Sequence, residues 1–306
     1  MQIRIHEVAP RDGLQNEAAI VPTEAKVAFI EHLVASGCTD IEVSSFVRPR
    51  WIPQLADAAE VVARLPRAEG VTYWGLVPNQ RGLDRAIDCG MEAVATFMSA
   101  SETHNNRNLN RTRRESLNGL RQVIRSAASS GLRVRGYIST VFGCPFEGPV
   151  APEASLNLAE ELLEAGAECI ALGDTTGMAN PTQVAELVGL FQDGGIPLDR
   201  LALHMHDTRG TALANVLAGF QAGIRHFDAS VAGLGGCPYA PGASGNLASE
   251  DLVYMLREMG HDTGIDLDAL AAAGHFIEQS LGRELPGRYH LYDKGSLSTA
   301  RAEESA

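Results

Sequence analysis

Residues 201–215 read Leu201-Ala-Leu-His-Met-His-Asp-Thr-Arg-Gly-Thr-Ala-Leu-Ala-Asn215, and this stretch decides the fold class. Leu201 and Leu203 open a segment that we interpret as a buried strand, and Gly210 ends it. The residues that follow, 211–221, have the composition of a helix. A strand that carries polar residues at its carboxyl end and then runs into a helix is the βα unit of an α/β protein.

His204 and His206 are two positions apart near the end of this strand. Alternate side chains of a strand share a face, about 7 Å apart at their Cα atoms, and two imidazoles that converge there can bind one metal ion. A pair of structural histidines explains the pattern equally well when it is taken alone. Asp207 points to the opposite face and is a poorer candidate ligand.

Composition narrows the class of protein. The chain has 306 residues, of which 45% are hydrophobic, and its net charge of −13 argues against a general nucleic-acid binder. No apolar run approaches the ~20 residues of a membrane span, and Met1 leads almost directly into a strand-like segment, so we expect no signal peptide and a cytoplasmic protein. The cysteines are odd in number and scattered, which favours reduced thiols over disulfides or a cysteine zinc site; they are Cys38, Cys89, Cys144, Cys169 and Cys237.

Strand-like and helical patterns alternate along the chain. We predict strands at residues 3–8, 40–45, 71–77, 93–98, 133–141, 169–172, 201–206 and 226–230, with helices between them and a long polar loop over residues 99–113. This alternation predicts a (β/α)₈ TIM barrel with a short C-terminal helical extension, and an open doubly wound sheet is the alternative. With no repeat or linker, we expect one catalytic domain over residues 1–291 and a disordered tail over residues 292–306.

Polar residues at the predicted strand ends carry the functional argument, because barrel enzymes place their active sites there. Taken singly, each residue can have a purely structural role: Asp12 can cap a turn, Glu42 can form an internal ion pair, and Asp174 can cap a helix. Their convergence on one rim is harder to explain structurally. The set comprises Arg11, Asp12, Glu42, Ser44, Ser45, Glu102, Thr103, His104, Asp174, Thr175, His204, His206, Cys237, Ser244 and Asn246.

Four of these residues form a plausible donor set for a metal ion. Asp12, His204, His206 and Asn246 offer oxygen and nitrogen ligands and no thiolate. Such a set favours an octahedral divalent ion, Mg²⁺ or Mn²⁺, with positions open for substrate oxygens, and Co²⁺ or Zn²⁺ would also fit. Arg11, next to a ligand, can stabilise a developing oxyanion.

The stretch from Val231 to Asn246 is rich in glycine and carries Cys237. It is either a flexible loop with an incidental thiol or a lid that delivers a proton-transfer group when substrate binds.

Four segments together resemble 3-hydroxy-3-methylglutaryl-CoA (HMG-CoA) lyase, a branch of the pyruvate-carboxyltransferase-like, metal-dependent barrels that include isopropylmalate synthase. They are Pro10-Arg-Asp-Gly-Leu-Gln-Asn-Glu17, Gly173-Asp-Thr-Thr-Gly177, His204-Met-His-Asp-Thr208 and Val231–Asn246, and the similarity runs from about Glu7 to Leu281. Arg-Asp-Gly and His-x-His occur across the superfamily, whereas Gly-Leu-Gly-Gly-Cys-Pro-Tyr is more specific to the lyases.

The resemblance implies a role for each matching residue. It assigns the metal ion to Asp12, His204, His206 and Asn246, enolate stabilisation to Arg11, proton transfer to Cys237, and an acidic function needed for activity to Glu42 and Asp174. The implied reaction is a retro-Claisen cleavage of HMG-CoA, a step of leucine degradation, into acetyl-CoA and acetoacetate. Its base is Asp174, a histidine or a metal-shell water.

Substrate contacts are expected on the rim loops. Ser45, Thr103 and His104 are candidates near the acyl group, and Thr103 and His104 are polar where the family is usually apolar. The phosphates of CoA would meet loop arginines that otherwise form a solvated basic surface, namely Arg48, Arg50, Arg107, Arg111 and Arg113. Arg209, after the histidine pair, is a further departure from the family.

Several alternatives stay open. A lyase for a related acyl-CoA such as citramalyl-CoA fits the polar pair, whereas an acetyl-CoA condensing enzyme would carry an added C-terminal regulatory region. A biotin-dependent carboxyltransferase would need a lysine at a strand end, where this chain has none, and a non-catalytic barrel would have lost metal ligands. We expect an acyl-CoA substrate, no nucleic-acid or membrane partner, and a homodimer or higher homo-oligomer.

Overall fold

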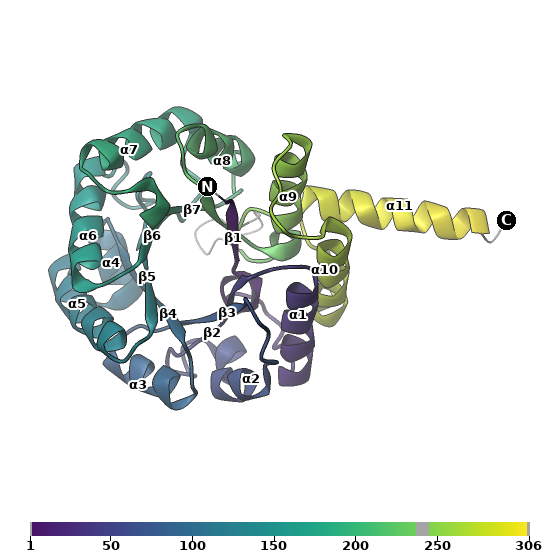
Figure 1. The fold of residues 1–306 in the computed structure, drawn as a ribbon, viewed down its shortest axis with the longest axis horizontal. Coiled ribbons are helices and arrows are strands. Elements are labelled where there is room, and N and C mark those ends of the chain that lie inside the picture. Colours follow the sequence, from purple (N-terminus) through teal and green to yellow (C-terminus); the bar gives the residue numbers. More distant parts are fainter. Residues whose placement is uncertain (1, 237–244, 305–306) are drawn as a thin grey trace.

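Eight parallel strands close into a barrel in sequence order, with β1 hydrogen-bonded to β8 and helices around the outside (Figure 1). The computed structural model describes residues 2–236 and 245–304, with the backbone alone for residues 297–304. The predicted (β/α)₈ barrel is confirmed, and the open sheet is wrong. The strands are β1 (Arg4–Glu7), β2 (Asp40–Ser45), β3 (Thr72–Leu76), β4 (Ala93–Ser99), β5 (Arg133–Ser139), β6 (Cys169–Asp174), β7 (Leu201–Met205) and β8 (His226–Ala229).

Most helices follow the strands as the periodicity predicts. They are α1 (Thr23–Ala35), α2 (Ala58–Arg64), α3 (Gln80–Asp88), α4 (Glu102–Leu109), α5 (Arg113–Ser129), α6 (Pro152–Ala165), α7 (Pro181–Asp193), α8 (Ala212–Gln221), α9 (Ser249–Glu258), α10 (Leu267–Leu281) and α11 (Arg288–Glu304). Short turns add η1 (Ala9–Gly13), η2 (Pro53–Leu55), η3 (Leu198–Arg200) and η4 (Val231–Gly233).

Helix α4 corrects the expected polar loop over residues 99–113. Its N-terminus is capped by Ser101, whose Oγ accepts a hydrogen bond from the His104 N–H over 3.0 Å. Asn110, at φ 53°, ends it in the left-handed region. The low hydrophobicity of this segment hid the helix, because caps rather than an apolar stripe define it.

Helix α11 occupies much of the segment that we expected to be disordered. Its start is held by Asp251, whose carboxylate accepts the backbone N–H groups of Arg288 and Tyr289. His290 and Lys294 bond Glu278 of α10. These contacts begin a helix that then projects away from the barrel (Figure 1). The boundary at residue 291 stays a prediction.

The alternation along β7 decides which residues reach the barrel interior. Leu201 and Leu203 pack outward in the main hydrophobic core, whereas Ala202 belongs to a small cluster inside the barrel. Helix α8 lies so close to β7 that a Cβ on Gly219 would stand 2.2 Å from Leu203 Cδ1. Because side chains alternate, His204 shares the inward face of Ala202.

Candidate active site

The turn after β1 places Arg11 and Asp12 over the barrel rim. Residues Ala9–Gly13 form one turn of π-helix, and the N–H groups of Arg11, Asp12 and Gly13 all point to the Val8 carbonyl oxygen. A Cβ on Gly13 would lie 3.1 Å from the Leu234 carbonyl oxygen, so the turn packs tightly against the segment after β8. The first and last βα units therefore meet at the site.

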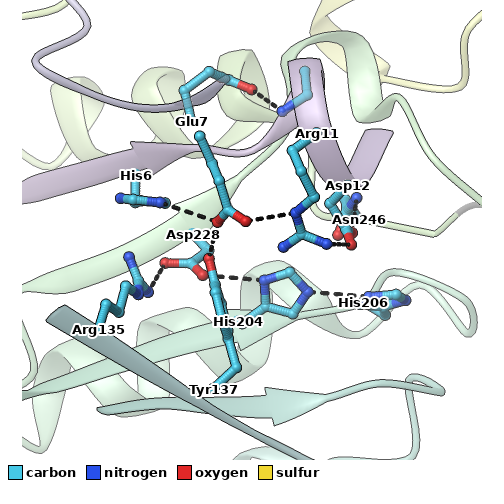
Figure 2. Close-up of polar contacts among 12 residues, drawn as sticks. His6, Glu7, Arg11, Asp12, Arg135, Tyr137, His204, His206, Asp228 and Asn246 are labelled. Carbon is cyan, nitrogen blue, oxygen red and sulfur yellow. Dashed lines mark hydrogen bonds and ion pairs between the residues drawn. The ribbon is translucent and has the colours of Figure 1, made fainter. Parts of the chain in front are cut away.

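Asp12, His204 and His206 offer ligand atoms that all lie within 4.8 Å of one another. The Nε2 atoms of the two histidines face each other over 3.2 Å (Figure 2). Asn246 donates through Nδ2 to Asp12 Oδ2 over 2.8 Å. Its buried Oδ1 has no hydrogen-bond partner among the described residues.

This donor set fits a divalent cation. Burial and the nearby His204 lower the pKa of His206 to about 3, so its imidazole is neutral. Burial alone would raise the pKa of Asp12, but Arg11 and the histidines lower it to about 2, which keeps the carboxylate ionised. A neutral His206 imidazole and an ionised Asp12 carboxylate are the protonation states that metal binding requires, and the Asn246 amide oxygen adds an acceptor that lacks a hydrogen-bond partner among the described residues.

The guanidinium of Arg11 is fixed between two carboxylates. Its Nε donates to Glu42 Oε1 over 2.6 Å, and its Nη1 bonds Asp12. Glu42 also accepts the Tyr137 hydroxyl over 2.5 Å and contacts His6 Nε2 at 3.4 Å. Burial would raise the pKa of Glu42, but Arg11 lowers it to about 2, so the pair stays ionised.

Asp174 closes the turn that follows β6. Its two oxygens accept the backbone N–H groups of Met178 and Ala179 over 2.7 and 3.0 Å. Burial raises its pKa to about 6 despite these bonds. Asp174 thus closes a turn and does not cap the next helix, α7, whose N-cap is Asn180, and its role as a base stays a prediction.

A cavity of about 270 Å³ opens in front of the metal-ligand cluster. His104 lines it, whereas Thr103 does not; the Thr103 N–H instead bonds Glu147 Oε1 over 2.6 Å. Ser45 is buried at the end of β2, where its Oγ accepts the Val47 N–H. The cavity walls comprise Arg11, Asp12, Gln15, Asn16, Val47, Ile52, Leu76, Phe97, His104, Asn108, Tyr137, Ile138, Ser139, Gly173, Thr175, His204, His206 and Gly236.

The candidate CoA-binding arginines lie outside this cavity. Arg48 and Arg111 line a separate groove of about 390 Å³ with Pro78 and Asn79. Arg107 stands over the Phe146 ring at 4.2 Å from its centroid. Sequence position alone could not tell which rim arginines face the reacting centre.

Two other expectations concern the loops. Arg209 donates to the carbonyl oxygens of Thr176 and Gly177 over 2.5 and 2.9 Å, so it joins the loops after β6 and β7. Cys237 and Ser244 lie outside the described residues. The cysteines that the structure describes are free thiols: Cys38, Cys89, Cys144 and Cys169.

The sequence analysis missed two charged residues inside the barrel. Asp228 of β8 contacts His204 Nδ1, and Arg135 of β5 bonds Asp228 (Figure 2). The signal was present, because charged residues at alternate positions of strands that line a barrel point inward.

The fold and the site together define a class, the (β/α)₈ barrels with a cluster of possible metal ligands at the carboxyl ends of their strands. The HMGL-like family model matches residues 2–277, and the chain belongs to this metal-dependent family.

Relatives cover nearly the whole chain. A hydroxymethylglutaryl-CoA lyase of Bacillus subtilis (strain 168) is 50% identical over 94% of this chain and 96% of its own length. A B. subtilis HMG-CoA lyase crystal structure aligns with a TM-score of 0.94 at 49% identity, over 96% of this chain and 98% of that one. The structure of an A. baumannii HMG-CoA lyase in complex with coenzyme A and 3-methylmalate aligns with a TM-score of 0.89 at 42% identity, over 94% of this chain and 93% of that one.

Proposed function

We propose that this protein is a carbon–carbon lyase that cleaves HMG-CoA into acetyl-CoA and acetoacetate with the help of a divalent metal ion. The convergence of Asp12, His204 and His206 on one point beside Arg11 carries the proposal. The relatives named as HMG-CoA lyases, matched over almost their full length, support the substrate and the reaction. The condensing enzyme and the carboxyltransferase are therefore less well supported.

Asp12, His204, His206 and Asn246 would hold the ion. When bound, the ion supplies Lewis acidity that makes the substrate 3-hydroxyl easier to deprotonate. Mg²⁺ or Mn²⁺ suits the oxygen-containing donor set best, and the orphaned Oδ1 of Asn246 supports the amide as a ligand.

Arg11 stabilises the negative charge that develops when the C2–C3 bond breaks. A base, Asp174 or a histidine, takes the 3-hydroxyl proton, and that oxygen becomes the keto oxygen of acetoacetate. The electron pair of the broken bond moves into the thioester, whose oxygen becomes an enolate oxygen. The Arg11 guanidinium is already oriented by Glu42 and Asp12, so little reorganisation accompanies the reaction. Cys237 then supplies the proton that converts the enolate carbon into the methyl group of acetyl-CoA.

The cavity has room for an acyl group of modest size next to Asp12, His204 and His206. Gln15, Asn108 and His104 offer polar contacts to the carboxylate and hydroxyl of the substrate, and Phe97 and Ile138 offer apolar ones. An acyl-CoA is also in keeping with the A. baumannii relative, which binds coenzyme A. Arg48 and Arg111, in the neighbouring groove, would face the phosphates of a CoA group that extends across that side of the rim.

One assay tests the proposal. Purified protein with Mg²⁺ or Mn²⁺ should convert HMG-CoA to acetyl-CoA and acetoacetate, with both products identified by mass spectrometry. The panel should include citramalyl-CoA, since His104 gives the cavity a polar wall. Preference for citramalyl-CoA would retain the lyase and replace its substrate, whereas no turnover of any 3-hydroxyacyl-CoA would refute the proposal.

The assembly and the compartment are separate predictions. No helix in the described part of the chain is long and apolar enough to cross a membrane. A homodimer or higher homo-oligomer stays our prediction, and exposed aromatic side chains on α9 and α11, Tyr254 and Tyr292, which are 45% and 67% exposed, would suit a contact between copies. Light scattering coupled to gel filtration tests the assembly, and cell fractionation tests the cytoplasmic location.

A further inference from the structure

Asp228 is a buried carboxylate that the mechanism above does not use, although it lies directly beside a proposed metal ligand. Strands β7 and β8 pair in register, so that His204 and Asp228 are opposite each other. Both side chains point into the barrel, and Asp228 Oδ2 lies 3.1 Å from His204 Nδ1 (Figure 2). Only 2% of Asp228 is exposed, so water does not compete for this contact.

Arg135 holds the other oxygen of the same carboxylate. It reaches from β5 across the barrel interior, and its Nη2 donates to Asp228 Oδ1. Its guanidinium also stands over the Tyr137 ring, 4.9 Å from the centroid, which fixes its direction. Asp228 is therefore held from both sides, and its charge is balanced within the interior.

The two proposed histidine ligands differ in the hydrogen-bond partner of their Nδ1 atom. His206 Nδ1 is buried without a hydrogen-bond partner among the residues that the structure describes. His204 Nδ1 faces an acceptor-only carboxylate, so the proton of the neutral ring belongs on Nδ1. The lone pair then lies on Nε2, which faces His206 Nε2 at the proposed metal position.

We propose that Asp228 is a positioning residue of the metal centre, and that Arg135 in turn fixes Asp228. The contact holds His204 in the tautomer and ring orientation that present Nε2 to the ion, and it increases the basicity of that nitrogen. The inference rests on the metal site proposed above. It assigns Asp228 to the binding of the ion rather than to the reacting atoms.

The tautomer of His204 can be measured directly in the metal-free wild-type protein. Nuclear magnetic resonance of protein labelled with ¹⁵N-histidine should show the His204 proton on Nδ1, with the signal assigned by its absence from His204→Gln. Asp228→Asn should shift the ring towards a mixture of tautomers. A wild-type His204 that carries its proton on Nε2 would overturn the proposal, whether or not any variant folds.

Metal affinity gives a second readout that does not depend on turnover. Calorimetric titration with Mn²⁺ should show 10- to 100-fold weaker binding for Asp228→Asn, about the usual effect of losing such a partner. Because Asp228→Asn leaves the Arg135 charge unpaired, Asp228→Asn combined with Arg135→Gln removes both charges together. The double variant should regain stability and still bind the ion weakly.

A matched control breaks another partly buried ion pair, which lies in the helix layer and does not line the cavity. Asp57→Asn removes the partner of Lys26 between α1 and α2, and should lower stability without changing Mn²⁺ affinity. Wild-type affinity in both Asp228 variants would leave Asp228 a structural residue only and overturn the proposal. A wild-type protein that binds no divalent ion would instead refute the metal site itself, so the two failures are distinguishable.

Discussion

Arg11 and Glu42 are 31 positions apart in the chain, yet Arg11 Nε and Glu42 Oε1 are 2.6 Å apart across the first two strands of the barrel. Glu42 is completely buried and has three partners, because Tyr137 and His6 contact its other oxygen. The carboxylate thus holds a guanidinium at the rim from below. This arrangement leaves Glu42 too far inside to act on substrate except through Arg11.

Glu42→Gln should therefore impair turnover more than substrate binding. Loss of a charge-assisted hydrogen bond, worth about 1.5–3 kcal/mol, predicts that kcat falls roughly 10- to 100-fold while KM changes little. Steady-state kinetics on HMG-CoA measures both. Tyr137→Phe is the control, since it removes one bond to Glu42 and keeps the charge that orients Arg11. Equal losses in the two variants would contradict the role of that charge.

His204→Ala removes an imidazole from the proposed metal cluster. We expect the loss of tight divalent-metal binding and of most activity, with the fold retained, because the ring faces the cavity rather than the helix layer. Metal titration, activity and circular dichroism check the three parts. Full activity of the wild-type protein after exhaustive chelation would exclude metal-dependent catalysis.

The structure separates two residues that the sequence analysis treated as a pair. His104 lines the cavity and Thr103 does not, so His104→Phe should change the ranking of acyl-CoA substrates and Thr103→Leu should not. A site that hydrogen-bonds its ligand rejects analogues that lack the matching group. Loss of a hydrogen bond from His104 to the acyl group should therefore change the substrate ranking strongly. Competition assays with HMG-CoA and citramalyl-CoA give the ratio of kcat/KM values. An unchanged ratio in both variants would remove His104 from substrate selection.

Cys237 lies outside the described residues, so its prediction rests on the sequence. Its place among glycines, next to Pro238, favours a thiol that a loop carries to the substrate. Cys237→Ser should lower kcat by roughly 10²- to 10⁴-fold, the usual contribution of a positioned acid or base, with metal affinity almost unchanged. Alkylation should inactivate the enzyme, and saturating substrate should protect it. A variant with near-normal turnover would move proton transfer to Asp174 or His204.

Glu7 predicts a pH dependence of stability. It is buried below the rim, where its Oε1 accepts the N–H groups of Ala9 and Val231 and its Oε2 bonds the Ser249 hydroxyl. Burial raises its pKa from 4.5 to about 7, although those hydrogen bonds oppose the shift. Between these two pH values the folded protein holds a proton that the unfolded chain has released.

The free energy of unfolding should therefore fall as pH rises from 4.5 to 7, with up to about 3 kcal/mol lost from this group, and change little above that range. Glu7→Gln lacks the titrating group and should lose less stability over the same range. Urea unfolding of both proteins at several pH values isolates the effect, because other buried carboxylates contribute equally to both. Parallel curves would show that Glu7 does not titrate there.

The periodicity of the sequence predicted every strand to within a few residues, because apolar strands bounded by glycine and polar turns carry a strong local signal. Helix α4 was missed since capping by Ser101 and Asn110 outweighs its polar composition. The cluster of possible metal ligands was predictable because its histidines are two positions apart at the end of one strand and Asp12 follows another. The alternation of their strands places Asp228 and Arg135 inside the barrel, but no local pattern predicts that they contact each other and His204 across it.

The barrel is closed by the pairing of β1 with β8, where Arg4 is opposite His226 and Glu7 is opposite Ala229. Asp12 follows the first of these strands and Asn246 follows the second, whereas His204 lies on β7, the strand next to β8, and His206 directly after it. An ion held by all of them binds only a chain whose two ends have already met. Such an ion would stabilise the closed barrel where its first and last strands pair. Adding metal should therefore slow unfolding, and the melting temperature should rise with the metal concentration.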